Sequence, residues 1–343
     1  MELARGDRGE ALRGPESAGY DAAMSSDRTP GGGGAVVRLL VILDRPVPLR
    51  IWLALIVVVS IVVAASLVRV VPAVVGGVSA LSLDWGIYAD GRGLWLSTGS
   101  PYTVPPPGWD PEHVFPYLYP PTSWLLLLLT YLPWPVVLLG LVPIALTPPR
   151  LGPAIPAIAL YALAVGPSVY FGNVNVLIAG LIVIAFRPGV VGGIALAAAS
   201  AVKAYPIVLL PLVWGDRRRL IWTMGTLVAL AVSGTVILGI GSWGDFFTTL
   251  MHEGPYTRAL VFNPLVALGP LRVVAAAALI VVGLAVGSPT LTLLGATWIS
   301  PGTTIHYLLT FTAALCVEPP IRGRDLPVRH LIGRVRARLT PRT

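Results

Sequence analysis

Charge and cysteine are both scarce in this 343-residue chain. Only 12% of the residues are charged and 55% are hydrophobic, and a soluble domain cannot bury so large an apolar fraction. A period-two alternation of apolar and polar residues is also absent, so the membrane-crossing segments are expected to be helices. Cys316 is the single cysteine, which excludes a disulfide within the chain. The sequence therefore predicts an all-α, polytopic transmembrane helical bundle.

Motifs of several enzyme classes are missing as well. There is no Gly-rich phosphate loop followed by Lys-Ser or Lys-Thr, no His-Glu-x-x-His, no Cys-x-x-Cys and no Gly-x-Ser-x-Gly. These absences argue against an ATPase, a zinc enzyme and a serine hydrolase. The acidic residues between the apolar segments are too scattered to assign a metal site, and the sequence implies no cofactor.

The positive charge of the chain comes almost entirely from arginine. The formal net charge is +8, and Lys203 is the only lysine. The arginines stand at the ends of apolar segments and in the C-terminal tail, as expected of cytoplasmic anchors under the positive-inside rule. We therefore expect the basic residues to face membrane lipid, and we expect no nucleic-acid partner.

The first apolar segment, Ile51–Val71, has about 20 residues and can cross a hydrocarbon core of about 30 Å. Arg45 and Arg50 precede it, and Arg217-Arg218-Arg219 precedes a later segment, so both places are expected on the inside. Both termini are then inside and the number of spans is even, about ten or about eight. The further apolar segments are Tyr119–Thr147, Gly152–Val169, Val174–Phe186, Val190–Trp214, Leu220–Ile240, Pro264–Gly287, Thr290–Ile299 and Thr303–Val317. Pro133-Trp134-Pro135 is expected to break the first of these, into one kinked helix or two short ones, and Lys203-Ala204-Tyr205-Pro206 to divide Val190–Trp214.

Composition divides the chain into three parts. Residues 1–48 are expected to be a disordered cytoplasmic tail, residues 49–318 a transmembrane domain, and residues 319–343 a basic cytoplasmic tail. Within the domain, residues 73–118 and 241–263 are expected to be outer loops. Several apolar segments are too short for a simple span. Such Pro- or Gly-interrupted pieces occur where they are buried in protein or line a water-filled cavity.

A polar stretch, residues 83–121, holds most of the acidic and aromatic residues that lie outside the apolar segments. Asp84 stands at its start, close to a span end, where partial desolvation would make a carboxylate a better base toward a sugar hydroxyl. A helix N-cap is an equally good interpretation, because Asp is favoured at that position. The aromatic rings of the stretch can stack on sugars, or they can anchor in lipid headgroups.

Lys203 lies inside an apolar segment, where an unpaired lysine costs on the order of 2.5–3.5 kcal/mol at the bilayer centre. It should therefore face a phosphate, a carboxylate or a wet cavity, unless a short helix lets it reach the interface. Arg258, in the second outer loop, is another candidate for binding a phosphate, and is otherwise a solvated loop charge.

Asn173 and Asn175 occur at an apparent break between two spans. Their amides can bind a ligand, or they can satisfy the backbone groups freed by Gly172. His306 begins an apolar run. It can donate a hydrogen bond to a phosphate or a sugar, or it can be an interface histidine without a ligand. The residues themselves leave these alternatives open.

Short motifs follow one another between Asp84 and His306. They are Asp84-Trp85-Gly86-Ile87-Tyr88, Gly99-Ser100-Pro101-Tyr102, Tyr119-Pro120-Pro121, Gly172-Asn173-Val174-Asn175, Lys203-Ala204-Tyr205-Pro206, and Ser300-Pro301 with His306. In this order they resemble the GT-C superfamily of glycosyltransferases, which depend on polyprenol-phosphate sugars. The resemblance is greatest to glycosyltransferase family 87, whose members are α-mannosyltransferases.

The resemblance implies that Asp84 is the catalytic aspartate and that the donor is a polyprenyl-phosphate-linked sugar, most fittingly mannose. The acceptor would be a hydroxyl of a glycolipid or glycan at the outer face of the plasma membrane. Inversion at the anomeric carbon needs one carboxylate base, whereas a retaining double displacement would need a second carboxylate close by. The residues expected to bind the donor or substrate are Tyr88, Tyr102, Tyr119, Asn173, Asn175, Lys203, Tyr205, Arg258 and His306.

Two other classes of function compete with this interpretation. A lipid or small-solute transporter predicts internal repeats and acids buried in mid-span, and the sequence contains neither. A non-catalytic membrane subunit, derived from such an enzyme, would be recognised by an inert Asp84.

Overall fold

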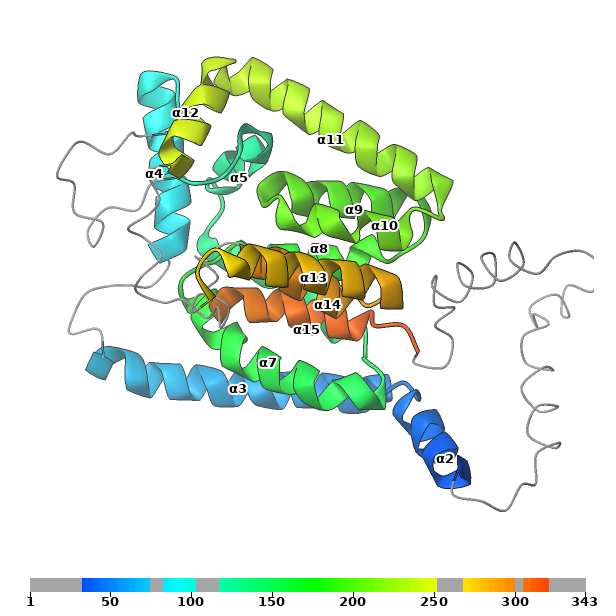
Figure 1. Cartoon of the computed structure of the whole chain (residues 1–343). Helices are drawn as coiled ribbons and strands as arrows, with labels where there is room; N and C mark the ends of the chain where they lie inside the picture. The colour runs from blue at the N-terminus through cyan, green and yellow to red at the C-terminus, as the bar shows by residue number, and fades with distance from the viewer. Residues whose placement is uncertain (1–32, 75–82, 103–116, 252–267, 300–304, 321–343) are drawn as a thin grey trace, which may run out of the picture. The chain divides into compact units, whose positions relative to one another are not determined.

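The computed structural model describes residues 33–74, 83–102, 117–251, 268–299 and 305–320 (Figure 1). Within these ranges all regular elements are helices, and the only β-type pairing is an isolated antiparallel bridge between Pro46 and Arg150. The all-α fold class is therefore confirmed. The chain divides into two units, Met1–Leu43 and Asp44–Thr343.

The first unit contributes helix α2 (Gly33–Leu43). This helix lies inside the segment expected to be disordered, residues 1–48. Its sequence explains the difference, because the residues from Ala35 to Leu43 are apolar apart from Arg38. The rest of the first unit, residues 1–32, lies outside the described residues, as does the expected basic tail beyond residue 320.

Three helices within the described ranges are long and apolar enough to cross a membrane, and a bent pair would add a fourth span. The pair meets at 116° and consists of Pro121–Leu129 and Trp134–Ala145. The break falls at Pro133, as the sequence predicted, because a proline ring cannot continue a helix. The three long helices are α3 (Leu49–Val74), α7 (Leu151–Tyr170) and α11 (Arg217–Leu238). The bent pair comprises η1 (Pro121–Ser123), α5 (Trp124–Leu129), η2 (Trp134–Gly140) and α6 (Leu141–Ala145).

The remaining apolar helices are shorter than a simple span. They are α8 (Asn175–Ala185), α9 (Gly189–Val202), α13 (Leu271–Val286), α14 (Pro289–Ile299), η6 (Ile305–Tyr307) and α15 (Leu308–Cys316). The polytopic class is confirmed, but the described helices of full span length are fewer than the eight to ten expected spans. The expected break at Lys203 is present: α9 ends at Val202, and η3 (Tyr205–Leu209) and α10 (Leu210–Val213) follow.

Helices also form inside both segments that were expected to be outer loops. Helix α4 (Leu83–Thr98) occupies much of the first, and α12 (Gly241–Met251) occupies the start of the second. Asp84 is the second residue of α4 and therefore lies in its first turn rather than at its N-cap. The interpretation of Asp84 as the cap of this helix is thus wrong.

Helix α8 lies at the centre of the packed helices. It contacts η2, α6, α9 and α15, and most of its residues are buried. Small residues permit this close packing, because a Cβ at Gly180 would lie 2.5 Å from the carbonyl oxygen of Gly140. A helix surrounded in this way needs no long apolar run of its own, which explains why α8 is short.

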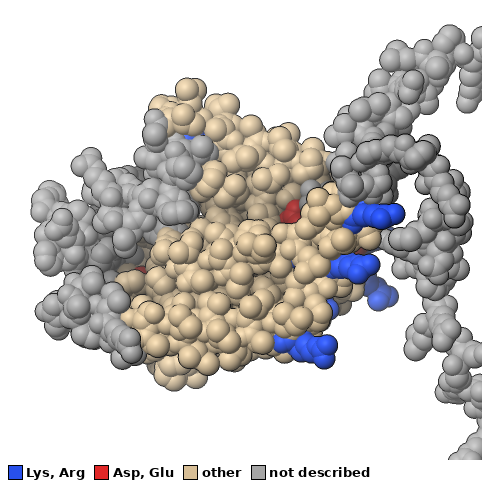
Figure 2. Space-filling model, turned by 90° about the horizontal axis from the view of Figure 1, so that it is seen from below, with Lys and Arg blue, Asp and Glu red and all other residues tan. Residues whose placement is uncertain are grey.

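Basic residues gather at one end of the second unit. The N–H of Leu151 donates to the carbonyl of Arg45 at 2.8 Å, and the N–H of Gly189 donates to Asp216 Oδ2 at 2.6 Å. These bonds bring together the starts of α3 and α7 and the starts of α9 and α11. Figure 2 shows Lys and Arg side chains gathered at one end of the visible surface. The arginines beside these helix ends are Arg45, Arg50, Arg150, Arg187, Arg217 and Arg218.

The turn between α7 and α8 and the C-terminal end of α9 lie at the end of the helices opposite to these arginines. Helices α7, α8 and α9 follow one another through short turns, so their starts and ends alternate (Figure 1). The residues 171–174 and Lys203 therefore lie at the end away from the arginines.

Candidate active site

The first turn of α4 is held against the turn that joins α7 to α8. The N–H groups of Asp84 and Trp85 donate to the carbonyl of Phe171 at 2.9 and 3.3 Å. Such N–H groups have no partner within their own helix. Phe171 is the C-cap of α7, and Gly172 follows it with a left-handed φ of 66°. The free N–H groups at the start of α4 and the free carbonyl at the end of α7 thus form hydrogen bonds with each other, which brings Asp84 beside Asn173.

Asn173 connects the carboxylate of Asp84 to the start of α8. Its Nδ2 donates to Asp84 Oδ2 at 2.6 Å, and its Oδ1 accepts from the N–H of Asn175 at 2.8 Å. A backbone N–H needs an acceptor and a carboxylate needs a donor, so the two contacts together determine how the amide is oriented. Asn173 therefore holds the Asp84 side chain in place.

His306, which lies far along the sequence from Asp84, faces the same carboxylate. Its Nε2 lies 3.9 Å from Asp84 Oδ2, and its Nδ1 lies 3.0 Å from the hydroxyl of Ser168 in α7. The ring also packs edge-on against Phe171, with centroids 5.8 Å apart. Asn173, from the turn between α7 and α8, and His306, from η6, thus meet at one oxygen of Asp84.

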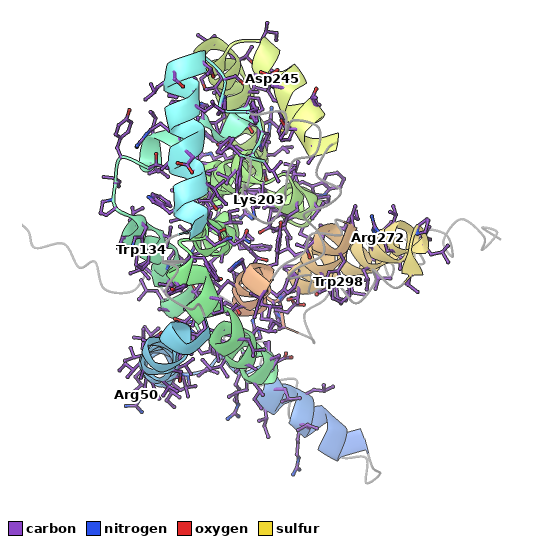
Figure 3. All side chains as sticks on the ribbon, turned by 90° about the vertical axis from the view of Figure 1, so that its left-hand side faces the viewer. Arg50, Trp134, Lys203, Asp245, Arg272 and Trp298 are labelled. Carbon is purple, nitrogen blue, oxygen red and sulfur yellow. The ribbon has the colours of Figure 1, made fainter. Side chains whose placement is uncertain are left out.

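Lys203 extends into a group of aromatic rings. Its Nζ lies 4.8 Å from the ring centroid of Tyr307 and 5.5 Å from that of Tyr119. Tyr205 packs on Tyr307 at 5.3 Å, and Figure 3 shows Lys203 surrounded by side chains. Among the described residues no carboxylate forms an ion pair with Lys203. The Asp84 carboxylate interacts with Lys203 through its charge but forms no direct ion pair with it, so the ammonium group among these rings is suited to bind a further anion.

The tyrosines of the polar stretch form a connected set. The Tyr88 hydroxyl lies 2.9 Å from that of Tyr119 and accepts from the N–H of Val174 at 3.3 Å. The Tyr102 hydroxyl donates to the carbonyl of Tyr119 at 2.6 Å. Tyr88 is 1% exposed and Tyr102 is 7% exposed, so their ring faces are covered. These two residues position Tyr119 and α8 through their hydroxyl groups.

Comparison with known families decides the class of this protein. The family model described as glycosyltransferase family 87 matches residues 106–299, which is more than half of the chain. The chain belongs to glycosyltransferase family 87. No curated protein and no solved structure matches it.

Membership of family 87, together with the apolar helices, makes the chain a membrane glycosyltransferase. The matched range includes Tyr119, Asn173 and Lys203, whereas Asp84 and His306 lie outside it. The contacts of the folded chain nevertheless place these two residues beside the matched ones. The site is therefore a property of the whole described domain.

Burial changes the protonation of the two titratable groups next to Asn173. It raises the pKa of Asp84 above its ordinary value, and this outweighs the Asn173 hydrogen bond and the Lys203 charge, which both lower that pKa. Burial also lowers the pKa of His306 to about 4, and the charge of Lys203 acts in the same direction. His306 is therefore neutral at pH 7, and Asp84 is a stronger base than an exposed aspartate.

The structure brings most of the expected site residues of this family 87 protein together. Asp84, Tyr88, Tyr119, Asn173 and His306 are joined by direct contacts, and Lys203 lies over the Tyr119 ring. Tyr102 and Asn175 contact members of this group, and Tyr205 packs on Tyr307, whose ring lies next to the Lys203 ammonium. Arg258 lies outside the described residues.

Asn175 differs from the other site residues because it is fully buried. Neither its Oδ1 nor its Nδ2 has a hydrogen-bond partner among the described residues. The sequence analysis missed Ser168 and Tyr307. Tyr307 follows His306 directly, so its position in the sequence could have identified it as a site residue. No feature of the sequence distinguishes Ser168 within the apolar helix α7.

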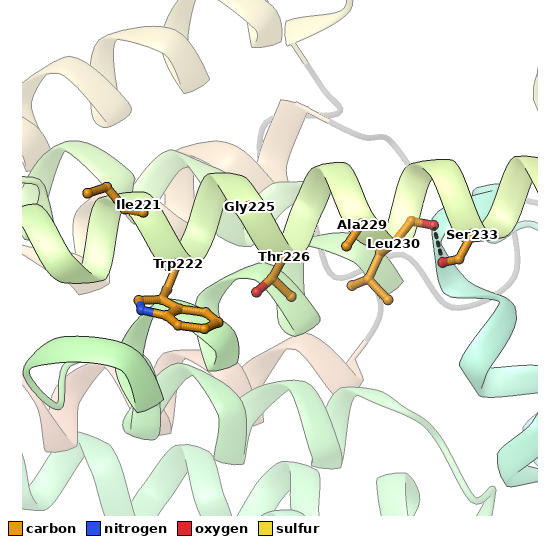
Figure 4. Close-up of a pocket in the computed structure, with 7 residues that line it drawn as sticks. All are labelled: Ile221, Trp222, Gly225, Thr226, Ala229, Leu230 and Ser233. Carbon is orange, nitrogen blue, oxygen red and sulfur yellow. Dashed lines mark hydrogen bonds between the residues drawn. The ribbon is translucent and has the colours of Figure 1, made fainter.

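A hollow of about 580 Å³ lies along α11, apart from these polar groups (Figure 4). Its lining carries no charged residue, and its polar members are Thr226 and Ser233. Ser233 accepts a hydrogen bond from Trp124 Nε1 at 2.9 Å. The hollow therefore offers apolar contact and no catalytic group. Within the described part of the chain, no three His, Cys, Asp or Glu side chains are grouped as metal ligands.

Proposed function

We propose that this family 87 protein transfers a mannosyl unit from a polyprenyl-phosphate donor to a hydroxyl of a glycolipid or glycan. Asp84 is the general base, and the reaction inverts the anomeric carbon. The observation that carries the proposal is the Asp84 carboxylate, held by Asn173 at 2.6 Å in the same cluster as Lys203.

The proposed reaction needs one proton acceptor and one stabilised leaving group. The acceptor oxygen attacks the anomeric carbon opposite the lipid phosphate, and its proton passes to Asp84. The bond from the anomeric carbon to the phosphate oxygen breaks, and the phosphate leaves with the bonding electrons. A cation at this position stabilises the charge that develops on the phosphate, and no described carboxylate forms a direct ion pair with Lys203.

The arrangement of carboxylates favours inversion. A retaining double displacement needs a second carboxylate about 5–5.5 Å from the first, to act as the nucleophile. In the described residues no other Asp or Glu contacts Asp84, Asn173 or Lys203. A single base next to a phosphate-binding cation supports direct displacement.

The distribution of charge supports a site that faces outward. Six arginines lie at the helix ends away from Asp84, and the positive-inside rule assigns such an end to the cytoplasm. Arg92 in α4 and Arg272 in α13 do not belong to this group. The six are Arg45, Arg50, Arg150, Arg187, Arg217 and Arg218. Asp84 then lies at the extracytoplasmic side of the plasma membrane, where a lipid-linked donor and a glycolipid acceptor both present their polar groups.

The test is transfer of labelled mannose from polyprenyl-phosphate-mannose into membrane glycolipids. We expect Asp84→Asn to lower the rate by about 10²- to 10⁴-fold, because the amide cannot accept the proton. The matched control is Asp90→Asn, an exposed aspartate of the same helix, which should transfer like the wild type. Undiminished transfer by Asp84→Asn would exclude Asp84 as the base, and absence of transfer by the wild type would contradict the proposed donor.

A further inference from the structure

The two carboxylate oxygens of Asp84 have different surroundings. Oδ2 accepts from Asn173 Nδ2 at 2.6 Å and lies 3.9 Å from His306 Nε2. Oδ1 has no hydrogen bond to any described residue, and it is not enclosed, since the side chain is 22% exposed. The open oxygen is therefore Oδ1, while Oδ2 is held by the protein.

The contact of Ser168 determines which nitrogen of His306 carries the proton. Ser168 is fully buried, and its side chain has no other hydrogen bond in the described part of the chain. If the hydroxyl donates to Nδ1, the proton of the neutral ring is on Nε2. If Nδ1–H donated instead, the hydroxyl hydrogen of Ser168 would be buried without an acceptor, which is unfavourable. Burial thus favours the Nε2–H tautomer.

The position of Asp84 favours the same tautomer. Nε2 of His306 points toward a carboxylate oxygen, which attracts an N–H and repels a nitrogen lone pair. His306 remains neutral, because burial lowers its pKa to about 4 and the charge of Lys203 acts in the same direction. Both neighbours of the imidazole therefore favour the tautomer in which Nδ1 accepts from Ser168 and Nε2 carries its proton toward Asp84.

We propose that Ser168 is a positioning residue, which holds His306 with its proton on Nε2 so that Oδ1 of Asp84 is left to accept the proton of the acceptor hydroxyl. Asn173 then donates a hydrogen bond to Oδ2, and the Nε2–H of His306 points toward the same oxygen from 3.9 Å, which is an electrostatic contact longer than a hydrogen bond. This inference rests on the proposed role of Asp84 as the base. It assigns His306 to the carboxylate rather than to a phosphate.

The kinetic test is Ser168→Ala, assayed as a function of pH. Without the serine hydroxyl, the proton of His306 is no longer fixed on Nε2, and the carboxylate loses part of the electrostatic stabilisation that this N–H provides from 3.9 Å. We expect kcat to fall about fivefold with the KM for the donor unchanged, as for the loss of one hydrogen bond. The acid limb of the pH profile should move to higher pH, because the pKa of Asp84 rises. The titratable groups facing Asp84 are His306, Lys203, Tyr88 and Tyr119.

The matched control is Ser200→Ala. Ser200 is a buried helix serine of α9 whose hydroxyl bonds only to the carbonyl of Leu196, at 2.8 Å. This variant should keep both the rate and the pH profile of the wild type. A purely structural role of Ser168 would lower the rate equally at every pH, and an unshifted acid limb in Ser168→Ala would overturn the proposal.

A spectroscopic test is independent of sugar transfer. The chain has four histidines, and the ¹⁵N signals of His306 are identified by their loss in His306→Gln. We expect the Nε2–H tautomer in the wild type and a mixture of tautomers in Ser168→Ala. An Nδ1–H tautomer or an imidazolium in the wild type at pH 7 would refute the proposal. A wild type that transfers no sugar would contradict the proposed function, while these spectra would still decide the role of Ser168.

Discussion

At the scale of single residues, Asn173 combines a structural contact with an electrostatic one. Its Oδ1 accepts from the N–H of Asn175 at the start of α8, and its Nδ2 donates to Asp84. The second contact lowers the pKa of Asp84, as the charge of Lys203 does to a smaller extent, although burial keeps that pKa raised overall. The basicity of Asp84 is therefore a balance between burial and these two neighbours.

Replacing Asn173 with Ala should shift this balance. The pKa of Asp84 rises further, and since only the deprotonated carboxylate is a base, the acid limb of the pH–rate profile should move to higher pH. Above the new pKa the rate should recover toward the wild-type value. The loss of the bond to α8 should also lower the free energy of unfolding by about 1 kcal/mol.

Lys203→Gln provides the comparison for this prediction. It removes a positive charge that also lowers the pKa of Asp84, but less than the Asn173 bond does. The acid limb should move in the same direction by a smaller amount. Rate profiles of both variants over the acid range check the prediction, and a limb that moves to lower pH in either variant would contradict it.

At the scale of elements, glycine determines how closely α8 approaches its neighbours. Gly180 lies against Gly140 in η2, and a Cβ at Gly180 would also lie 2.8 Å from the Cα of Gly140. The obstructing atoms belong to backbone, so no side-chain rotation can relieve the overlap. The position of α8 in turn sets that of Asn173, just before its start, which joins this packing to the candidate active site.

Gly180→Ala should therefore destabilise the protein by about 1–3 kcal/mol, as expected for overpacking a close helix contact. The control is Gly225→Ala in α11, where no atom lies within 4 Å of the added Cβ. That variant should unfold like the wild type or slightly later, because Ala favours a helix. Thermal unfolding in detergent measures both. Equal midpoints for the two variants would show that the Gly180 contact is not tight.

At the scale of the whole molecule, the separation of the arginines from Asp84 predicts how the protein lies in the membrane. The arginine end should face the cytoplasm and the Asp84 end the outside. Cys316 is buried and 7% exposed, so a variant without it can carry single reporter cysteines. Exposed positions for them exist at both ends, at Arg218 in the first turn of α11 and at Ser97 in α4.

In a Cys316→Ser background, a membrane-impermeant thiol reagent should label Ser97→Cys on intact cells. Arg218→Cys should be labelled only after the cells are opened. The opposite pattern would place Asp84 in the cytoplasm and would contradict the proposed outer site. Sugar transfer by each variant serves as the control for correct folding.

The sequence alone determined the helical membrane class, because no soluble fold can bury so apolar a chain. It also predicted the breaks at Pro133 and Lys203, since proline and a lysine in an apolar segment act locally. It singled out Asp84, but it left the roles of base and helix cap equally open. Only the position of Asp84 within the first turn of α4 decided against the cap.

The tertiary structure decided which residues meet at the site. Asp84 and Asn173 are 89 residues apart, and Ser168 and His306 are 138 residues apart. Helices that are apolar on every side give no periodic signal for the direction in which they pack, so the sequence cannot predict these pairs. Ser168 is a single hydroxyl in an apolar helix, and it becomes informative only when the fold places it against His306. The types of residue at the site could therefore be predicted from the sequence, but their partners and orientations depend on how the helices pack.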